Sequence, residues 1–474
     1  MKHNLILLDN SISPRRKVWS LAWPTILEQL LMMVVIYVDA AMVGSIGVNA
    51  TAAIAVNTTV IWLIQGLMSG LAVGASVLVA KKIGEGNPDE ARDYLRQAIL
   101  GMLALGIFVT LVGQLILAPH LATWMGADEV LKEPARQYMR IVSASFLFQV
   151  ILAVGSSIIR CSGDTKTPML YNILNNVVNI VANAIFIYPT RTVAIFGMEV
   201  TLWGAGMGVG GAAMGTSIAA VIAGSLTMCR LFSKKFAVAV SLKDHYRFNR
   251  KLMTEIVKLG LPAAFERITL SSGQILTTAM VTGMGSSILA AHQLATTAES
   301  VCYMPVWGFH VASTTLTAQS LGAGEKKMAK EFSVICMKYG VLVMVFCATM
   351  MFIFAPQMIG VFIRDSAVIA MGAAMLRIEA FAEPCVAISE VCCGVLKGAG
   401  DTRWPFYVSV VGMWCVRLPL AFIAIKFLDI GLAGIWIPMA LDWTVRMILN
   451  SYRYKSGSWL HHWDVLAEKP QEGM

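Results

Sequence analysis

Charged residues are scarce in this chain. They make up 14% of its 474 residues, against about 25% in an average soluble protein. The nine cysteines contain no C-x-x-C pair, and the sequence has no G-x-x-x-x-G-K-[ST], H-E-x-x-H or G-x-S-x-G motif. These absences argue against an ATP-driven pump, a zinc hydrolase and a serine hydrolase. We therefore expect a protein that is not an enzyme and has no cofactor, with cysteines that serve as small buried apolar residues.

Apolar residues dominate instead, at 57% of the chain, and the mean hydropathy is +0.69. A membrane-spanning helix needs roughly 20 mainly apolar residues. The first eighteen residues lack the apolar core of a cleavable signal, so we expect the first apolar stretch to be retained. The sequence predicts an all-α polytopic membrane protein with twelve spans. They are 19–44, 52–80, 97–118, 137–159, 169–189, 204–229, 253–282, 288–319, 332–355, 368–396, 405–427 and 432–454.

Positive charge is distributed unevenly between the loops. With the N-terminus inside, the inner segments hold 25 Lys and Arg residues and the outer segments hold seven. Cytoplasmic loops of membrane proteins carry such an excess. We therefore expect both termini in the cytoplasm and the protein in the cell membrane. The formal net charge of +9 then needs no nucleic-acid partner.

The chain repeats itself at an offset of 238 residues, which becomes 237 in the later part of each repeat. Pro24 and Glu28 fall on Pro262 and Glu266, and the loop 163–168 (GDTKTP) is echoed by 400–405 (GDTRWP). Six helices per repeat give both halves the same orientation, a parallel repeat. We predict two pseudo-symmetric six-helix lobes. The expected segments are a tail (1–18), an N-lobe (19–231), a basic linker (232–252), a C-lobe (253–454) and a second tail (455–474).

Several motifs resemble those of the multidrug and toxic compound extrusion (MATE) transporter family, over almost the whole chain. They are PTILEQ at 24–29, YVDAAMVG at 37–44, AAHQ at 290–293, GFHVASTTLTAQSLGAG at 308–324 and the two G-D-T loops. The resemblance implies an exporter of amphipathic, often cationic, organic molecules that is coupled to H⁺ or Na⁺.

Asp39 is the sharpest candidate for an ion-coupling residue. It lies five residues before Gly44, about 7 Å below the outer end of the first span. Burying a carboxylate there is costly, and such residues usually mark function. Its repeat mate is Thr277, so the fold does not require the acid. A structural acid bonded to neighbouring hydroxyls remains the alternative, whereas the resemblance implies a coupling role.

Amides line one face of the 169–189 span, at positions 172, 176, 179 and 183. They could join helices by hydrogen bonds or coordinate a cation beside Asp39. By the resemblance, Asn179, Asn183 and Thr216 match the family's cation site. Asn183 stands where relatives often have a second Asp, so we favour H⁺ over Na⁺, with Na⁺ at Asp39, Asn179 and Asn183 as the alternative.

Other polar residues in the spans are candidates for the substrate path. The alternatives are structural. The Glu28 and Glu266 carboxyls, when protonated, could donate to backbone carbonyls that Pro24 and Pro262 free. His292 could make an ordinary hydrogen bond, and Glu379, Glu383 and Glu390 could form ion pairs with Arg417 and Arg446. Asp442 and Arg446 are expected to pair with each other. The substrate-path candidates are Tyr37, Glu266, His292 and Glu299.

These features together predict a secondary active antiporter that exports cationic organic compounds by alternating access. A flippase for lipid-linked saccharides would share the architecture, but its polyanionic cargo should need several Arg or Lys residues lining the cavity, whereas the spans carry Asp39, Glu266 and Glu299 and few interior cations. The expected partners are small organic substrates and the lipid bilayer, and we expect a monomer.

The charge bias generates a test of topology. Cysteines introduced at Lys2 and at Gly473 should react with a membrane-impermeant maleimide only after the cells are permeabilised. Labelling of either position in intact cells would contradict the predicted orientation and the parallel repeat with it.

Overall fold

The computed structural model describes residues 12–195, 198–241 and 243–464. The predicted tails lie partly outside this range, since 1–11 and 465–474 are not described. The first half of the chain forms eight helices, a short π-helical segment and a β-hairpin. These elements are α1 (Pro14–Gly44), α2 (Val48–Gly84), α3 (Pro88–Val112), the π segment Gly113–Leu117, α4 (Ala118–Trp124), α5 (Glu129–Ala144), α6 (Phe146–Cys161), α7 (Lys166–Phe186), β1 (Pro189–Ile195), β2 (Met198–Ala205) and α8 (Val209–Phe232).

The regular elements in the described part of the second half are all helices. Its elements are α9 (Arg250–Thr282), α10 (Ser286–Tyr303), α11 (Pro305–Gly322), α12 (Lys326–Gly360), α13 (Ser366–Ala380), α14 (Glu383–Gly398), α15 (Arg403–Val410), the π segment Val411–Arg417, α16 (Leu418–Lys426), α17 (Ala433–Lys455) and the 3₁₀ turn Ser458–His461.

Each of the twelve predicted spans corresponds to one helix or to consecutive helices. Seven are long and apolar enough to cross a membrane by length and composition, and the bent pair α5–α6 makes eight. The other spans are α9 and α17, and two pairs that are each broken in the middle, α10–α11 and α13–α14. The twelve-helix architecture is therefore confirmed.

The β-hairpin was not predicted. Its strands pair antiparallel, with Val193 opposite Val200, and they occupy the segment between the predicted spans 169–189 and 204–229. The boundary at 204 is wrong, because β2 continues to Ala205 and α8 begins at Val209. Hydropathy measures apolar length, so it does not separate an apolar strand end from a helix start.

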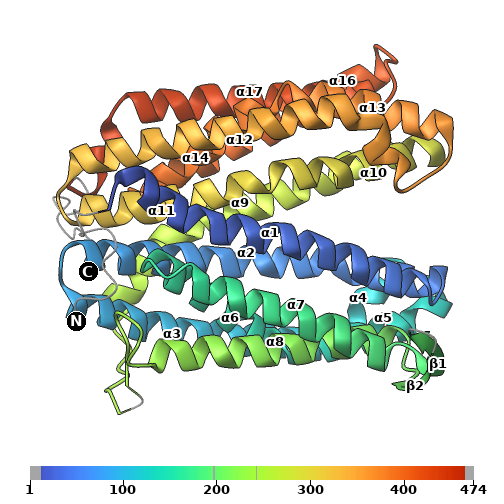
Figure 1. Cartoon of the computed structure of the whole chain (residues 1–474), viewed down its shortest axis with the longest axis horizontal. Coiled ribbons are helices and arrows are strands. Elements are labelled where there is room, and N and C mark those ends of the chain that lie inside the picture. Colours follow the sequence, from blue (N-terminus) through green and yellow to red (C-terminus); the bar gives the residue numbers. More distant parts are fainter. Residues whose placement is uncertain (1–11, 196–197, 242, 465–474) are drawn as a thin grey trace.

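Figure 1 shows two helical bundles side by side, one built from α1–α8 and the other from α9–α17. The start of α1 and the end of α17 lie at the same end of the molecule, opposite the β-hairpin. This placement agrees with an even number of spans. The side of the membrane on which that end lies remains a prediction.

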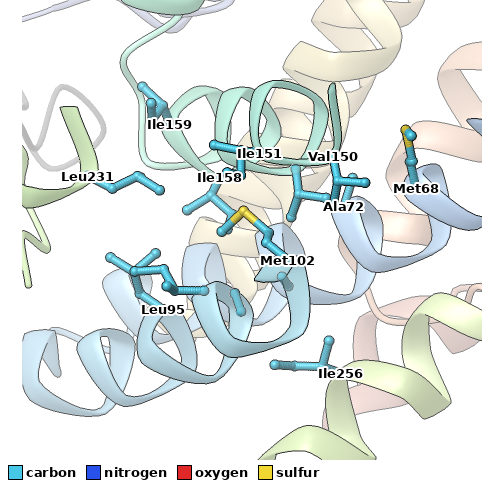
Figure 2. Close-up of a cluster of buried hydrophobic side chains, with 14 of the residues drawn as sticks. Met68, Ala72, Leu95, Met102, Val150, Ile151, Ile158, Ile159, Leu231 and Ile256 are labelled. Atoms are coloured by element: carbon cyan, nitrogen blue, oxygen red, sulfur yellow. The ribbon is translucent and has the colours of Figure 1, made fainter. Parts of the chain in front are cut away.

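The N-lobe core contains side chains from α2, α3 and α6, with Met102, Val150 and Ile158 fully buried (Figure 2). Ile256 of α9 belongs to the same cluster. A helix of the second half thus contributes to the core of the first, and the two lobes share buried apolar surface.

The lobes also cross at two glycines that are repeat mates. A Cβ on Gly84 of α2 would lie 2.1 Å from the carbonyl oxygen of Gln319, and a Cβ on Gly322 of α11 would lie 2.2 Å from that of Lys81. Lys81 and Gln319 are themselves 238 residues apart. The α2–α11 crossing is therefore pseudo-symmetric, and only glycine allows the two backbones to approach so closely.

Ion pairs are duplicated between the lobes in the same way. Glu28 and Glu266 each pair with a cation on the fourth span of their own lobe, rather than with proline-freed carbonyls. Each G-D-T loop is in turn fixed to the end of its lobe's last helix. The pairs are Glu28–Arg160 at 3.0 Å, Glu266–Lys397 at 3.0 Å, Asp164–Arg230 at 2.8 Å and Asp401–Arg453 at 2.7 Å.

The linker predicted at 232–252 is packed against the N-lobe. Phe236, Val238 and Val240 are buried in its core, and Asp244 pairs with Arg96 of α3 at 3.0 Å. The backbone N–H of Ser241 and the Arg96 guanidinium hold the pKa of Asp244 below its ordinary value. The Gln97 side chain of α3 also bonds to the Arg247 carbonyl at 2.8 Å and to the Asn249 backbone N–H at 3.0 Å, so the linker is held to the N-lobe up to the start of α9.

The glycine crossing can be tested by adding a single methyl group. We expect Gly322→Ala to destabilise the purified protein by about 1–3 kcal/mol, because the methyl meets backbone that is fixed by its own helix. Gly44→Ala is the matched control, since no atom lies within 4 Å of its Cβ. Equal unfolding midpoints in detergent for the two variants would contradict the tight crossing.

Candidate functional site

Asp39 lies on α1, where the helix packs against α7. The Asn183 amide Nδ2 donates to its Oδ1 at 2.8 Å. Asn183 is buried, and it comes from the amide face predicted from sequence. The structure thus brings together two of the residues named as the coupling site, across the contact between the first and fifth spans.

Asn179 completes the network when its amide is oriented by its neighbours. With the nitrogen turned toward the acid, it lies 2.8 Å from Asp39 Oδ1 and 3.0 Å from Oδ2, and the amide oxygen accepts from the Thr216 backbone N–H at 3.3 Å. Amide orientation is assigned from such networks. In this orientation, Asp39 accepts bonds from two amides.

Thr216 lies on α8, beside Asn179, and its hydroxyl donates to the Ala212 carbonyl at 3.1 Å. The Asn183 Oδ1 atom is buried and has no hydrogen-bond partner among the described residues. It faces Gly215 of α8, where a Cβ would lie only 2.0 Å away. The absence of a side chain at Gly215 therefore leaves room for the Asn183 Oδ1 atom, which has no hydrogen-bond partner among the described residues.

This donor set fits a proton more readily than Na⁺. Na⁺ would need several oxygen ligands, but the two amides present N–H groups to the carboxylate. Asp39 and Thr216 supply oxygens directly, while Asn179 and Asn183 would supply theirs only after the amides rotate. The four predicted residues do form one cluster. Their role in ion coupling stays a prediction.

Tyr37 lies near Asp39 in sequence but contacts the other lobe. Its hydroxyl donates to the backbone carbonyl of Thr297 on α10 at 2.9 Å, and its ring lies 5.9 Å from that of Phe362. It therefore bridges the lobes beside the candidate site. Its place on the substrate path stays a prediction.

The C-lobe candidates have separate surroundings. Glu266 is ion-paired with Lys397, while buried His292 accepts a hydrogen bond from the Trp436 indole at 3.2 Å. Glu299 of α10 is partly exposed. The Trp436 contact favours the plain hydrogen-bonding alternative for His292 over a proton relay.

Two other acids lack the ion pairs expected for them. Glu379 and Glu383 are fully buried, and neither carboxyl has a hydrogen-bond partner in the described part of the chain. Arg417 and Arg446 both bond to Asp442 instead, at 2.9 Å and 2.5 Å. The predicted Asp442–Arg446 pair is confirmed, and the expected pairs of Glu379 and Glu383 with these arginines are wrong.

Two repeated six-helix lobes, with a half-buried acid bonded to buried amides in one of them, define the architecture of a secondary transporter. The MatE family model matches residues 24–185 and 262–423, two segments at the repeat offset seen in the sequence. The chain therefore belongs to the MatE family.

Relatives and solved structures agree with this assignment. "Probable multidrug resistance protein NorM" of Thermotoga maritima is 27% identical over 97% of this chain and 96% of its own length. "Uncharacterized transporter YisQ" of Bacillus subtilis is also 27% identical, over 93% of this chain and 94% of its own length. A MOP superfamily transporter from Pyrococcus furiosus superposes with a TM-score of 0.85 at 22% identity, covering 95% of this chain and 97% of that one. An outward-facing MATE family transporter superposes with a TM-score of 0.84, at the same sequence identity and coverage.

The pairing of the C-lobe charges predicts contrasting stabilities. Asp442→Asn should lower the free energy of unfolding by about 3–5 kcal/mol, because two buried guanidinium groups lose their charged partner. Glu383→Gln removes no hydrogen bond and should have a much smaller effect. Thermal unfolding of the two purified variants measures this contrast. A larger loss in Glu383→Gln would show that its carboxyl is the one that the C-lobe needs.

Proposed function

We propose that this chain is a secondary active antiporter, with no enzymatic activity, that exports amphipathic cationic compounds in exchange for H⁺. The observation that carries the proposal is the Asp39 carboxylate, held by the amides of α7. Family membership and the multidrug resistance names of relatives such as NorM support export of drug-like compounds. We further propose that it acts as a monomer in the cell membrane.

Proton loading would change the hydrogen-bonding role of Asp39. An ionised carboxyl only accepts hydrogen bonds, whereas a protonated one also donates. Both amides now present donors to it, so a new O–H group needs an acceptor. Rotating the Asn183 amide would supply its unpaired Oδ1 and would alter the contact between α1 and α7. A bound proton would thereby favour one arrangement of the N-lobe over another.

The charges in the C-lobe support a cationic cargo over a lipid-linked saccharide. The cations at its helix contacts, Lys397, Arg417 and Arg446, each lie beside a carboxylate. Arg417 and Arg446 share the single carboxylate of Asp442, and Lys397 has that of Glu266, so these cations do not form a free cradle for a polyanion. Glu299, Glu379 and Glu383 add carboxyl groups to the same lobe. A flippase for lipid-linked saccharides remains the alternative function, and transport assays distinguish it from the antiporter.

The decisive experiment uses purified protein in liposomes, with a cationic dye and with ΔpH and ΔNa⁺ imposed separately. We expect the wild type to respond to ΔpH. Asp39→Asn should fold and bind the dye but lose at least tenfold of the gradient-driven flux. Asp128→Asn is the matched control, because Asp128 is exposed and caps no backbone N–H.

Full gradient-driven flux in Asp39→Asn would place the ion site elsewhere, first among the C-lobe acids. A response to ΔNa⁺ alone would replace H⁺ by Na⁺ at this site. Movement of a fluorescent lipid-linked saccharide across the same liposomes, with no dye transport, would favour the flippase.

A further inference from the structure

A second cluster of chemically reactive side chains lies in the C-lobe, between α9, α11 and α14. The His310 Nδ1 atom is 3.0 Å from Glu390 Oε2, and the Sγ atom of Cys393 lies close to both. The three donor atoms are all within 4.8 Å of one another. His310 and Cys393 are buried, at 7% and 5% exposure. Neither the coupling site nor the cargo path proposed above uses this cluster.

Glu266 places another carboxylate at its edge. Its Oε1 atom is 3.9 Å from Cys393 Sγ. Its Oε2 atom is buried and accepts no hydrogen bond from any described residue, although Lys397 Nζ lies 3.0 Å away. Glu266 is itself only 8% exposed. The Glu266 carboxylate therefore lies beside the thiol through Oε1, which also accepts from Lys397 at 3.1 Å, while its second oxygen keeps unused lone pairs.

We propose that His310, Glu390 and Cys393 form a binding site for a soft divalent cation of the zinc type, with Glu266 as the carboxylate that can complete it. Imidazole, thiolate and carboxylate are the ligands that Zn²⁺ takes in proteins, whereas Na⁺ and Mg²⁺ prefer oxygen alone. Metal–ligand bonds of about 2.0–2.3 Å separate tetrahedral donors by roughly 3.3–3.8 Å. The observed spacing reaches this range after the side chains move inward by about 1 Å.

The charge of the site is compatible with a divalent ion. Glu266, Glu390 and a Cys393 thiolate carry three negative charges, and Lys397 with a divalent cation carries three positive ones. Since an uncompensated charge is costly inside a protein, this neutral sum favours a doubly charged metal over a singly charged one. Lys397 stays in place as the counter-charge of Glu266.

The internal repeat shows that the scaffold does not need these residues. The N-lobe positions equivalent to His310, Glu390 and Cys393 are Ala72, Ala153 and Ser156, which offer no imidazole, carboxylate or thiol. The ion pair at the edge of the cluster is nevertheless retained in both lobes. The potential ligands are therefore a specific property of the C-lobe, added to a shared framework.

The test uses the full chain, purified in detergent under reducing conditions, with Co²⁺ as the spectroscopic substitute for Zn²⁺. We expect one Co²⁺ per chain, with sulfur-to-cobalt charge transfer in the near ultraviolet, and displacement by Zn²⁺. Cys393→Ser should abolish the sulfur band and weaken Zn²⁺ binding at least tenfold. It should fold, because Ser occupies the equivalent position of the N-lobe.

Two further variants keep the result interpretable. His310→Gln should weaken Zn²⁺ binding at least tenfold. Cys336→Ser is the control, since this buried thiol of α12 lies outside the cluster, and it should bind as the wild type does. Absence of a sulfur band, or unchanged Zn²⁺ affinity in Cys393→Ser, would overturn the site and leave His310–Glu390 as an ordinary ion pair.

Discussion

Water is absent from the hydrocarbon core of a membrane, so every buried charge must find its partner within the protein. Much of this structure satisfies that constraint. Arg160 and Lys397 each neutralise a glutamate four residues after a proline, and Arg417 and Arg446 share Asp442. Because these charges are already paired, acids with other surroundings stand out. Asp39 is held by amides alone, and Glu379 and Glu383 accept no hydrogen bond among the described residues.

The repeat separates what the scaffold requires from what each lobe has added. The glycine crossing, the Glu28 and Glu266 pairs and the two G-D-T loops occur twice at equivalent positions. These features fix helix contacts and loop ends, and either lobe needs them. Asp39 has Thr277 as its mate, and His310 has Ala72. A duplicated framework has thus been kept while the polar residues inside the two lobes diverged.

The sequence was informative where a local pattern determines structure. Apolar length located the spans, and helical spacing placed Asn179 and Asn183 on the face that meets Asp39. Contacts between distant segments could not be derived in this way. Lys397 lies one position beyond the predicted span 368–396, yet it pairs with Glu266, 131 positions away. The i,i+4 spacing predicted the Asp442–Arg446 pair. The bond from Arg417 to the same Asp442 depends on how two spans pack, and no spacing rule reports that.

Helix α1 connects the candidate ion site to both lobes. It packs against α7 of its own lobe and α11 of the other. Residues two positions apart on a helix point about 200° away from each other, so Asp39 bonds to Asn183 while Tyr37 reaches across to Thr297. Lower on the helix, Glu28 is fixed by Arg160 and Asn172. A change in the partners of Asp39 therefore acts on a segment that is anchored at one end and bonded to the opposite lobe at the other. In the antiporter that we propose, such a segment would convert a proton on one carboxyl into a shift between lobes, because only the contacts near Asp39 and Tyr37 would need to be exchanged.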